Sequence, residues 1–211
     1  MQLNESPVYP EADVMEQGSD VSILSHIQKP GVAATVWQRD LSVDFSNWIK
    51  GLSPENLPQF RSLVTVDALE NSVHAACDLS HTPAGKHRDM LAGDIAALGF
   101  IMSEIMGSSL LHVRLEVVNT DACRKFHVDN MTARMLCTYL GRGTQIAQRG
   151  AESSPVTVSA GDATLLRGAR WPGKEETTIQ HRSPPIAGTG ETRLLLAIDP
   201  GSDYKPEIVY N

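Results

Sequence analysis

The chain has few cysteines, few aromatic residues and no long apolar run. Its three cysteines are too few and too widely spaced for a disulfide framework, so core thiols in a reducing compartment are expected. Aromatic residues make up only 5% of the chain, so aliphatic side chains and seven methionines must fill the core. No apolar run is long enough to span a bilayer. The amino end is acidic and polar, unlike a signal peptide. We expect a cytoplasmic protein with no membrane partner.

The chain also lacks any run of lysine and arginine. Its net charge is −7. Because phosphate backbones are bound by basic surfaces, nucleic acid is not an expected partner. An apolar fraction of 41% over 211 residues is enough for the core of one domain. We expect residues 1–20 to form a mobile tail and residues 21–211 to form a single domain.

Residues 21–108 are expected to be mainly helical, although 31–37 has the β-branched content of a strand. Ser53-Pro54-Glu55 and Thr82-Pro83 each combine an N-cap residue with a proline suited to the first helical position. The second helix carries an apolar stripe at spacings of 4, 3, 4 and 3, formed by Leu91, Ile95, Leu98, Met102 and Ile105. Gly107 is expected to end it. We expect most of residues 40–107 to form a helical layer that covers a sheet.

From residue 110 the pattern changes to short strands separated by turn-forming residues. Eight strands are expected, over 110–118, 123–128, 134–140, 144–147, 155–158, 162–167, 177–181 and 192–198. This number of strands over residues 109–211 is typical of a double-stranded β-helix, the jelly roll of cupin-like proteins. We therefore predict an α+β fold with an N-terminal helical layer packed on one sheet of the jelly roll.

A candidate metal site is formed by His127, Asp129 and His181. In an extended strand, residues two apart share a face, so His127 and Asp129 can reach one metal. Two imidazoles and a carboxylate can hold one face of an octahedral Fe(II) and leave positions open. The alternative is that the His-x-Asp pair lies in a surface turn and His181 is a hydrogen-bonded strand residue.

Arg193 is a candidate anion-binding residue because it lies in an apolar row of the last strand. A buried guanidinium needs a partner, and a carboxylate is its best one. Thr138 or Tyr139 could add a hydroxyl, although strand alternation lets only one of them face inward. An internal salt bridge to Arg193 is an equal alternative. Cys123 or Cys137 beside the histidines would favour zinc over iron, but both also suit ordinary core positions.

The segment from Cys123 to Thr144, which contains the His127-Val128-Asp129 sequence, resembles the uncharacterised bacterial domain of unknown function family eighteen twenty-six. The resemblance continues through residues 36–39, the stretch at His181 and the strand of Arg193. Members of that family often accompany zinc-responsive genes, so this resemblance implies a zinc-binding alternative linked to metal homeostasis.

A wider resemblance is to Fe(II)/2-oxoglutarate-dependent dioxygenases, which share the His-x-Asp sequence, a distal His and a later Arg. It implies that His127, Asp129 and His181 hold iron and that Arg193 holds the distal carboxylate of 2-oxoglutarate. Many of those enzymes have Ser two positions after the Arg, where this chain has Leu195, so the hydroxyl has to come from Thr138 or Tyr139. The expected function is hydroxylation of a substrate that the sequence does not identify, and the oligomeric state is equally open. The alternative is a non-catalytic zinc-binding cupin-like protein.

Overall fold

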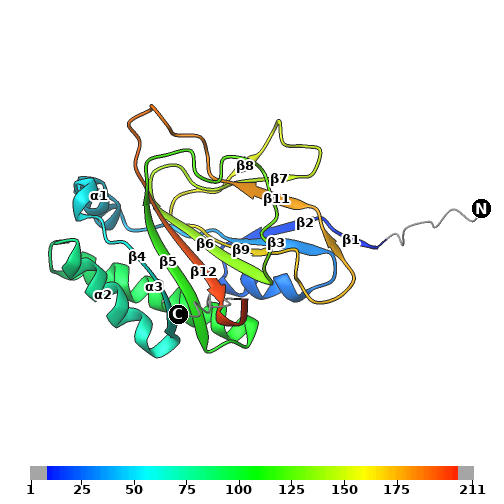
Figure 1. Cartoon of the computed structure of the whole chain (residues 1–211), viewed down its shortest axis with the longest axis horizontal. Helices are drawn as coiled ribbons and strands as arrows, with labels where there is room; N and C mark the ends of the chain where they lie inside the picture. The colour runs from blue at the N-terminus through cyan, green and yellow to red at the C-terminus, as the bar shows by residue number, and fades with distance from the viewer. Residues whose placement is uncertain (1–8, 204–211) are drawn as a thin grey trace, which may run out of the picture.

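The computed structural model describes residues 9–203 and contains three sheets and a helical layer (Figure 1). The seven strands of the large sheet are ordered β2 (Val14–Gly18), β3 (Val32–Trp37), β9 (Ala163–Arg167), β6 (Ala133–Leu140), β12 (Arg193–Pro200), β5 (Leu110–Val118) and β4 (Phe60–Thr65). The three-stranded sheet is ordered β11 (Ile179–Arg182), β7 (Gln145–Gln148) and β8 (Val156–Thr157), and β1 (Glu11–Ala12) pairs with β10 (Glu176–Thr177). The large sheet is mixed, because β2 pairs parallel to β3 and its other pairs are antiparallel.

The helical layer covers one face of the large sheet (Figure 1). It contains α1 (Val43–Gly51), α2 (Leu69–Leu79) and α3 (Lys86–Met106), and short 3₁₀ helices occur at η1 (Val21–Gln28), η2 (Pro54–Asn56), η3 (Val66–Ala68) and η4 (Gly201–Asp203). The predicted stripe of α3 is confirmed, because Leu91, Ile95, Leu98 and Met102 are fully buried against the sheet. Gly107 ends α3 in the left-handed conformation, with φ of 62°. The α+β class and the helical layer are therefore as predicted.

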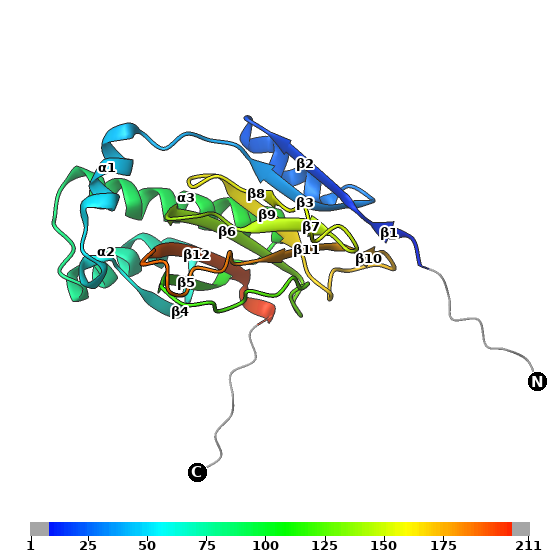
Figure 2. The same ribbon diagram turned by 90° about the horizontal axis from the view of Figure 1, so that it is seen from above.

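The three-stranded sheet packs on the other face of the large sheet, in front of it in Figure 2. Strand alternation separates the two faces. In β6, Met135 and Cys137 face the helical layer and Leu136 faces the small sheet. In β12, Leu196 faces the helices and Ala197 faces the small sheet. Odd-numbered residues of β12 and residues 134, 136 and 138 of β6 therefore point into the space between the two sheets.

Two helix predictions in the N-terminal half are wrong in part. Residues 60–65 form β4, which pairs antiparallel with β5 along the edge of the large sheet. The sequence 53–55 starts only the three-residue 3₁₀ helix η2, and α3 begins at Lys86 instead of at Pro83. A free sheet edge supplies hydrogen bonds that local sequence does not reveal, which explains β4.

The predicted mobile tail is also wrong in part. Residues 11–18 form β1 and β2, which pair with β10 and β3. Residues 1–8 lie outside the described residues. Among the described helices, none combines the length and the apolar character that a bilayer crossing requires.

The predicted strand over residues 123–128 is not formed. Cys123 has a left-handed backbone with φ of 57°, and only His127 makes a β-bridge, to His181. The other predicted strands between 110 and 198 are observed within a few residues of their expected bounds. The single bridge is nevertheless enough to bring the His-x-Asp sequence beside β11.

Candidate metal centre and its cavity

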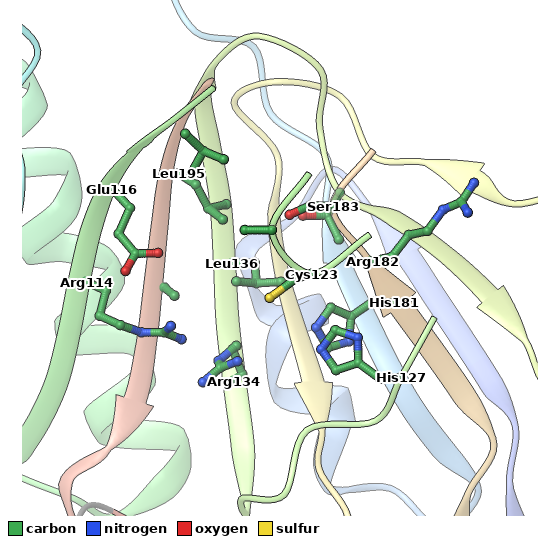
Figure 3. A pocket seen from close by; sticks show the side chains of 14 residues that line it. Arg114, Glu116, Cys123, His127, Arg134, Leu136, His181, Arg182, Ser183 and Leu195 are labelled. Atoms are coloured by element: carbon green, nitrogen blue, oxygen red, sulfur yellow. The ribbon is translucent and has the colours of Figure 1, made fainter. Parts of the chain in front are cut away.

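His127 and His181 are held side by side by backbone hydrogen bonds. The His127 N–H donates to the His181 carbonyl over 3.1 Å, and the His181 N–H donates back over 3.0 Å. Their rings are 4.6 Å apart between centroids, and Figure 3 shows both on the same wall of a cavity. Directly opposed residues of an antiparallel pair point to the same face, so the bridge fixes both imidazoles toward one point.

Asp129 completes a group of three candidate ligands. One oxygen or nitrogen from each of His127, Asp129 and His181 lies within 4.8 Å of the others. Asp129 Oδ2 is 3.2 Å from His181 Nε2, and Oδ1 is 3.6 Å from His127 Nε2. Oδ2 is buried but makes no hydrogen bond within the part of the chain described. A buried carboxylate oxygen without a hydrogen bond needs another positive partner, and a metal ion supplies one.

Arg134 orients the Asp129 carboxylate. Its Nη1 donates to Asp129 Oδ1 over 2.7 Å, while Nε and Nη2 donate to the two oxygens of Asp199 over 2.7 and 2.9 Å. Arg134 is on β6 and Asp199 on β12, so two central strands of the sheet position this guanidinium. The remaining oxygen of Asp129, Oδ2, is thereby left facing the histidines.

The pKa values of the three groups reflect this arrangement. Burial alone raises the pKa of the Asp129 carboxyl, but the neighbouring imidazoles of His127 and His181 and the charge of Arg134 hold it well below its ordinary value. Burial lowers the pKa of His181, whereas the nearby Asp129 carboxylate raises that of His127. Asp129 is therefore ionised and His181 is favoured in its neutral form, the states in which both bind metal.

The loop that carries Asp129 packs against a glycine. A Cβ at Gly168 would lie 2.0 Å from the Met131 carbonyl oxygen and 2.8 Å from that of Asp129. The backbone N–H of Ala169 donates to the Asp129 carbonyl over 2.8 Å. Only glycine permits this approach of the two backbones. The position of Asp129 therefore depends on the residues that follow β9.

Arg193 is fully buried and pairs with no carboxylate of the described residues. Within residues 9–203 it forms no ion pair, and its hydrogen bonds go to neutral oxygens: Nε to the Arg142 carbonyl over 2.6 Å, Nη1 to Ser183 Oγ over 2.9 Å and Nη2 to Thr138 Oγ1 over 3.3 Å. Burial lowers the pKa of its guanidinium to about 10. The predicted alternative, an internal salt bridge, is not observed in this part of the chain.

Of the two predicted hydroxyl donors, only Thr138 lies beside Arg193. Tyr139 is on the opposite face of β6, where its hydroxyl donates to Asp94 Oδ2 over 2.6 Å. The prediction that Tyr139 binds the co-substrate is wrong, because strand alternation turns it toward the helices. Ser183 was not predicted. It lies two residues after His181 and contacts Arg193, and that two-residue spacing was the sequence signal for it.

The cysteines do not join the ligand group. Cys137 is buried on the helical face of β6, and its thiol donates to the Gly161 carbonyl over 3.6 Å. Cys123 lines the cavity but is not one of the clustered ligand groups found among the described residues. A zinc site that includes Cys137 is therefore excluded by geometry.

One cavity contacts the histidines and extends between the sheets (Figure 3). His127 and His181 form one wall, and Leu136, Leu195 and Ala197 supply apolar surface. Ser183 connects this cavity to Arg193. The opposite wall comes from β5, whose Arg114 and Glu116 were not singled out in the sequence. The sequence feature that could have identified them is the alternation of charged and apolar residues in 110–118, which places Arg114 and Glu116 on one face of the strand. Arg134 was identified only as part of a strand.

The chain belongs to the family described as "Protein of unknown function (DUF1826)", whose model matches residues 18–199. No curated protein matches it significantly. The expected family membership is thereby confirmed, and the family description itself assigns no activity.

Solved structures are similar to this chain at low sequence identity. The 2-oxoglutarate complex of dioxygenase for auxin oxidation 1 from Arabidopsis thaliana covers 95% of this chain and 99% of its own, with 10% identity and a TM-score of 0.51. The dioxygenase for auxin oxidation of rice covers 79% of this chain and 72% of its own, at 14% identity and a TM-score of 0.44. A prolyl-4-hydroxylase from Pseudomonas putida covers 84% and 96%, at 11% identity and a TM-score of 0.43. At these identities the likeness concerns the fold alone.

Proposed function

We propose that this member of the family is a non-haem Fe(II)/2-oxoglutarate-dependent dioxygenase that hydroxylates a substrate. The proposal is carried by the presence of two features at the same cavity. A His-Asp-His group converges at one position. The second is Arg193, a fully buried arginine that forms no ion pair among residues 9–203 and whose neighbour Ser183 lines the same cavity as the two histidines.

The strand order supports a double-stranded β-helix as the architecture of this site. Antiparallel strands β9, β6, β12 and β5 form one side. The other side is formed by the His127 bridge, then β11, β7 and β8, also antiparallel. Chain segments therefore alternate between the two sides, as in a jelly roll. The ligands and Arg193 lie on different strands of this arrangement.

The ligand set fits Fe(II). Two imidazoles and one carboxylate without a thiolate are the facial triad that leaves coordination positions open. The buried Asp129 Oδ2, which has no hydrogen bond within residues 9–203, fits a metal ligand. When bound, Fe(II) with 2-oxoglutarate supplies the activation of O₂ needed to hydroxylate a C–H bond.

The protein's own contribution is to bind, orient and exclude water. Arg134 fixes the orientation of Asp129. Arg193 offers its guanidinium to a carboxylate of 2-oxoglutarate, with Ser183 and Thr138 as hydroxyl neighbours. Leu136 and Leu195 give the cavity between these ends an apolar lining, which limits access of water.

Absorption spectroscopy of the anaerobic protein tests this proposal. Fe(II) followed by 2-oxoglutarate should give a weak visible metal-to-ligand charge-transfer band. His181→Ala should abolish it, because His181 is a predicted ligand, whereas His74→Ala should retain it, since His74 lies on α2 outside the ligand group. If the wild-type protein gives no band and binds zinc tightly without 2-oxoglutarate, the non-catalytic zinc-binding alternative replaces the dioxygenase.

A further inference from the structure

Arg114 faces the candidate metal centre from the opposite side of the cavity. It lies on β5, and Figure 3 shows its guanidinium directed toward Arg134, with His127 and His181 beyond. The same side chain also lines a second, adjoining cavity with Arg61, His112 and Asp199. Arg114 therefore stands where the reaction site meets an opening that a substrate can occupy.

The hydrogen-bonding capacity of the Arg114 guanidinium is poorly satisfied among the described residues. Its Nε is buried and has no hydrogen-bond partner in the part of the chain that the structure describes. Its ion pair, from Nη2 to Asp199 Oδ2, is long at 3.7 Å. Both oxygens of Asp199 already accept hydrogen bonds from Arg134, over 2.7 and 2.9 Å. Burial and the neighbouring charge of Arg134 lower the pKa of Arg114.

Two further carboxylates around the cavity accept hydrogen bonds from other arginines. Glu116, two residues further along the same face, accepts a hydrogen bond from Arg61 over 2.6 Å. Asp129 accepts one from Arg134 over 2.7 Å. Leaving a buried guanidinium donor without an acceptor is costly, so this geometry favours an anionic ligand.

We propose that Arg114 binds a carboxylate of the primary substrate, separately from the carboxylate assigned to Arg193. The inference rests on the proposed function and specifies its substrate class as a monoanionic carboxylic acid. The planar guanidinium fork matches a carboxylate. Because Asp199, Asp129 and Glu116 already bring negative charge to this region, a single charge fits better than the two of a phosphate monoester.

Binding of benzoate and its neutral analogue benzamide tests the proposal. Calorimetry is performed on the full-length chain saturated with Mn²⁺ and 2-oxoglutarate, so that the Arg193 site is filled. Benzoate should bind and benzamide should bind more weakly. Arg114→Gln should weaken benzoate binding roughly tenfold or more, because a charge-assisted pair is lost. The affinity of Arg114→Gln for 2-oxoglutarate should change less than about twofold, because a lost ion pair would cause a larger change.

Arg182→Gln is the matched control. Arg182 also lines the cavity, but its guanidinium lies over the Phe126 ring and points away from the histidines in Figure 3. This variant removes the same charge and should retain benzoate binding. Equal losses in both variants would indicate general attraction by positive charge and overturn the proposal.

Two further outcomes separate this proposal from the dioxygenase proposal. In the first, 2-oxoglutarate binds but benzoate does not, or benzoate competes with 2-oxoglutarate and its binding depends on Arg193. Arg114 then does not bind the substrate carboxylate, whereas the dioxygenase proposal is unaffected. If 2-oxoglutarate fails to bind while benzoate binds with dependence on Arg114, the anion site stands and the co-substrate assignment fails.

Discussion

Arg134 and Arg193, two arginines of the site with little or no exposure, differ in which groups accept their hydrogen bonds. Arg134 donates three hydrogen bonds to two carboxylates, Asp129 and Asp199. Arg193 donates only to neutral oxygens within residues 9–203. Arg134 therefore has its carboxylate partners without a ligand, whereas Arg193 has no carboxylate hydrogen-bond partner in the described part of the chain. We therefore assign a positioning role to Arg134 and a binding role to Arg193.

Arg193→Gln should weaken 2-oxoglutarate binding while leaving metal binding intact. The amide retains some hydrogen-bonding capacity toward Ser183 and Thr138 but cannot pair with a carboxylate. The loss should be roughly 30-fold or more, as when one partner of a buried charge pair is removed. Titration of the charge-transfer band with 2-oxoglutarate measures it, with Arg149→Gln, which alters an exposed pair, as the control. An unchanged titration would remove Arg193 from the site.

Arg134→Leu should destabilise the protein strongly. It leaves the largely buried Asp129 and the buried Asp199 without their main partner, which costs about 3–5 kcal/mol when a buried pair is broken. Arg149→Leu breaks the exposed pair with Glu176 and should cost at most about 1 kcal/mol. Urea unfolding of both variants without added metal compares them. Similar free energies of unfolding would contradict the positioning role.

At the scale of the elements, the candidate ligand residues could be predicted from the sequence, but the secondary structure of the segment that contains His127 and Asp129 could not. His127, Asp129 and His181 follow from ligand chemistry and residue spacing, and they do converge. The strand expected over 123–128 is instead a loop with one bridge. Sequence patterns describe a face of an element, but the contacts that fix an irregular loop lie far away in the chain.

The same limit explains the edge strands. Residues 60–65 pair with β5, and residues 14–18 pair with β3, without any strong alternation of their own. By contrast, the stripe of α3 and the apolar β12 determine their own structures. Thr138 and Tyr139 could not be distinguished beforehand, because the inward face of β6 depends on its register with β12.

Gly168→Ala should disturb the loop that holds Asp129. Its Cβ would overlap the Met131 carbonyl oxygen, so the loop must move, and metal affinity should fall about tenfold or more, the scale reported for groups that orient a ligand. Gly93→Ala is the matched control, because a Cβ there meets open space on α3 and favours the helix by about 0.5–1 kcal/mol. Manganese titration and urea unfolding distinguish the two effects. Unaltered metal affinity in Gly168→Ala would show that the loop adjusts freely.

Across the whole molecule, strand pairing and hydrogen bonds connect the N-terminal segment to the C-terminal half. Strand β1 lies along β10 in Figure 2. The buried Arg167 of β9 donates to the Ile27 carbonyl over 3.0 and 2.8 Å and to that of Lys29 over 2.6 Å. Glu175 accepts from Arg167 over 2.6 Å and from the Gly31 N–H over 2.8 Å. One ion pair thus joins β9, the turn after η1 and the segment before β10.

The Glu175 link should make stability depend on pH in the acidic range. The hydrogen bond from Arg167 lowers the pKa of Glu175 below its ordinary value of 4.5. A carboxyl with a lowered pKa in the folded state binds fewer protons there than in the unfolded chain. Its stabilising contribution is therefore complete above about pH 4.5 and is lost as the pH falls through the folded pKa.

Glu175→Gln should accordingly lose stability at pH 7 but show a shallower decline between about pH 5 and 3, since its amide does not titrate there. Glu104→Gln removes an exposed carboxylate of α3 and should keep the wild-type dependence. Urea unfolding of the three proteins across that range measures the difference. Parallel pH profiles for Glu175→Gln and the wild type would mean that the connection between the two halves does not depend on this charge. The N-terminal strands would then be held by backbone pairing with β3 and β10 alone.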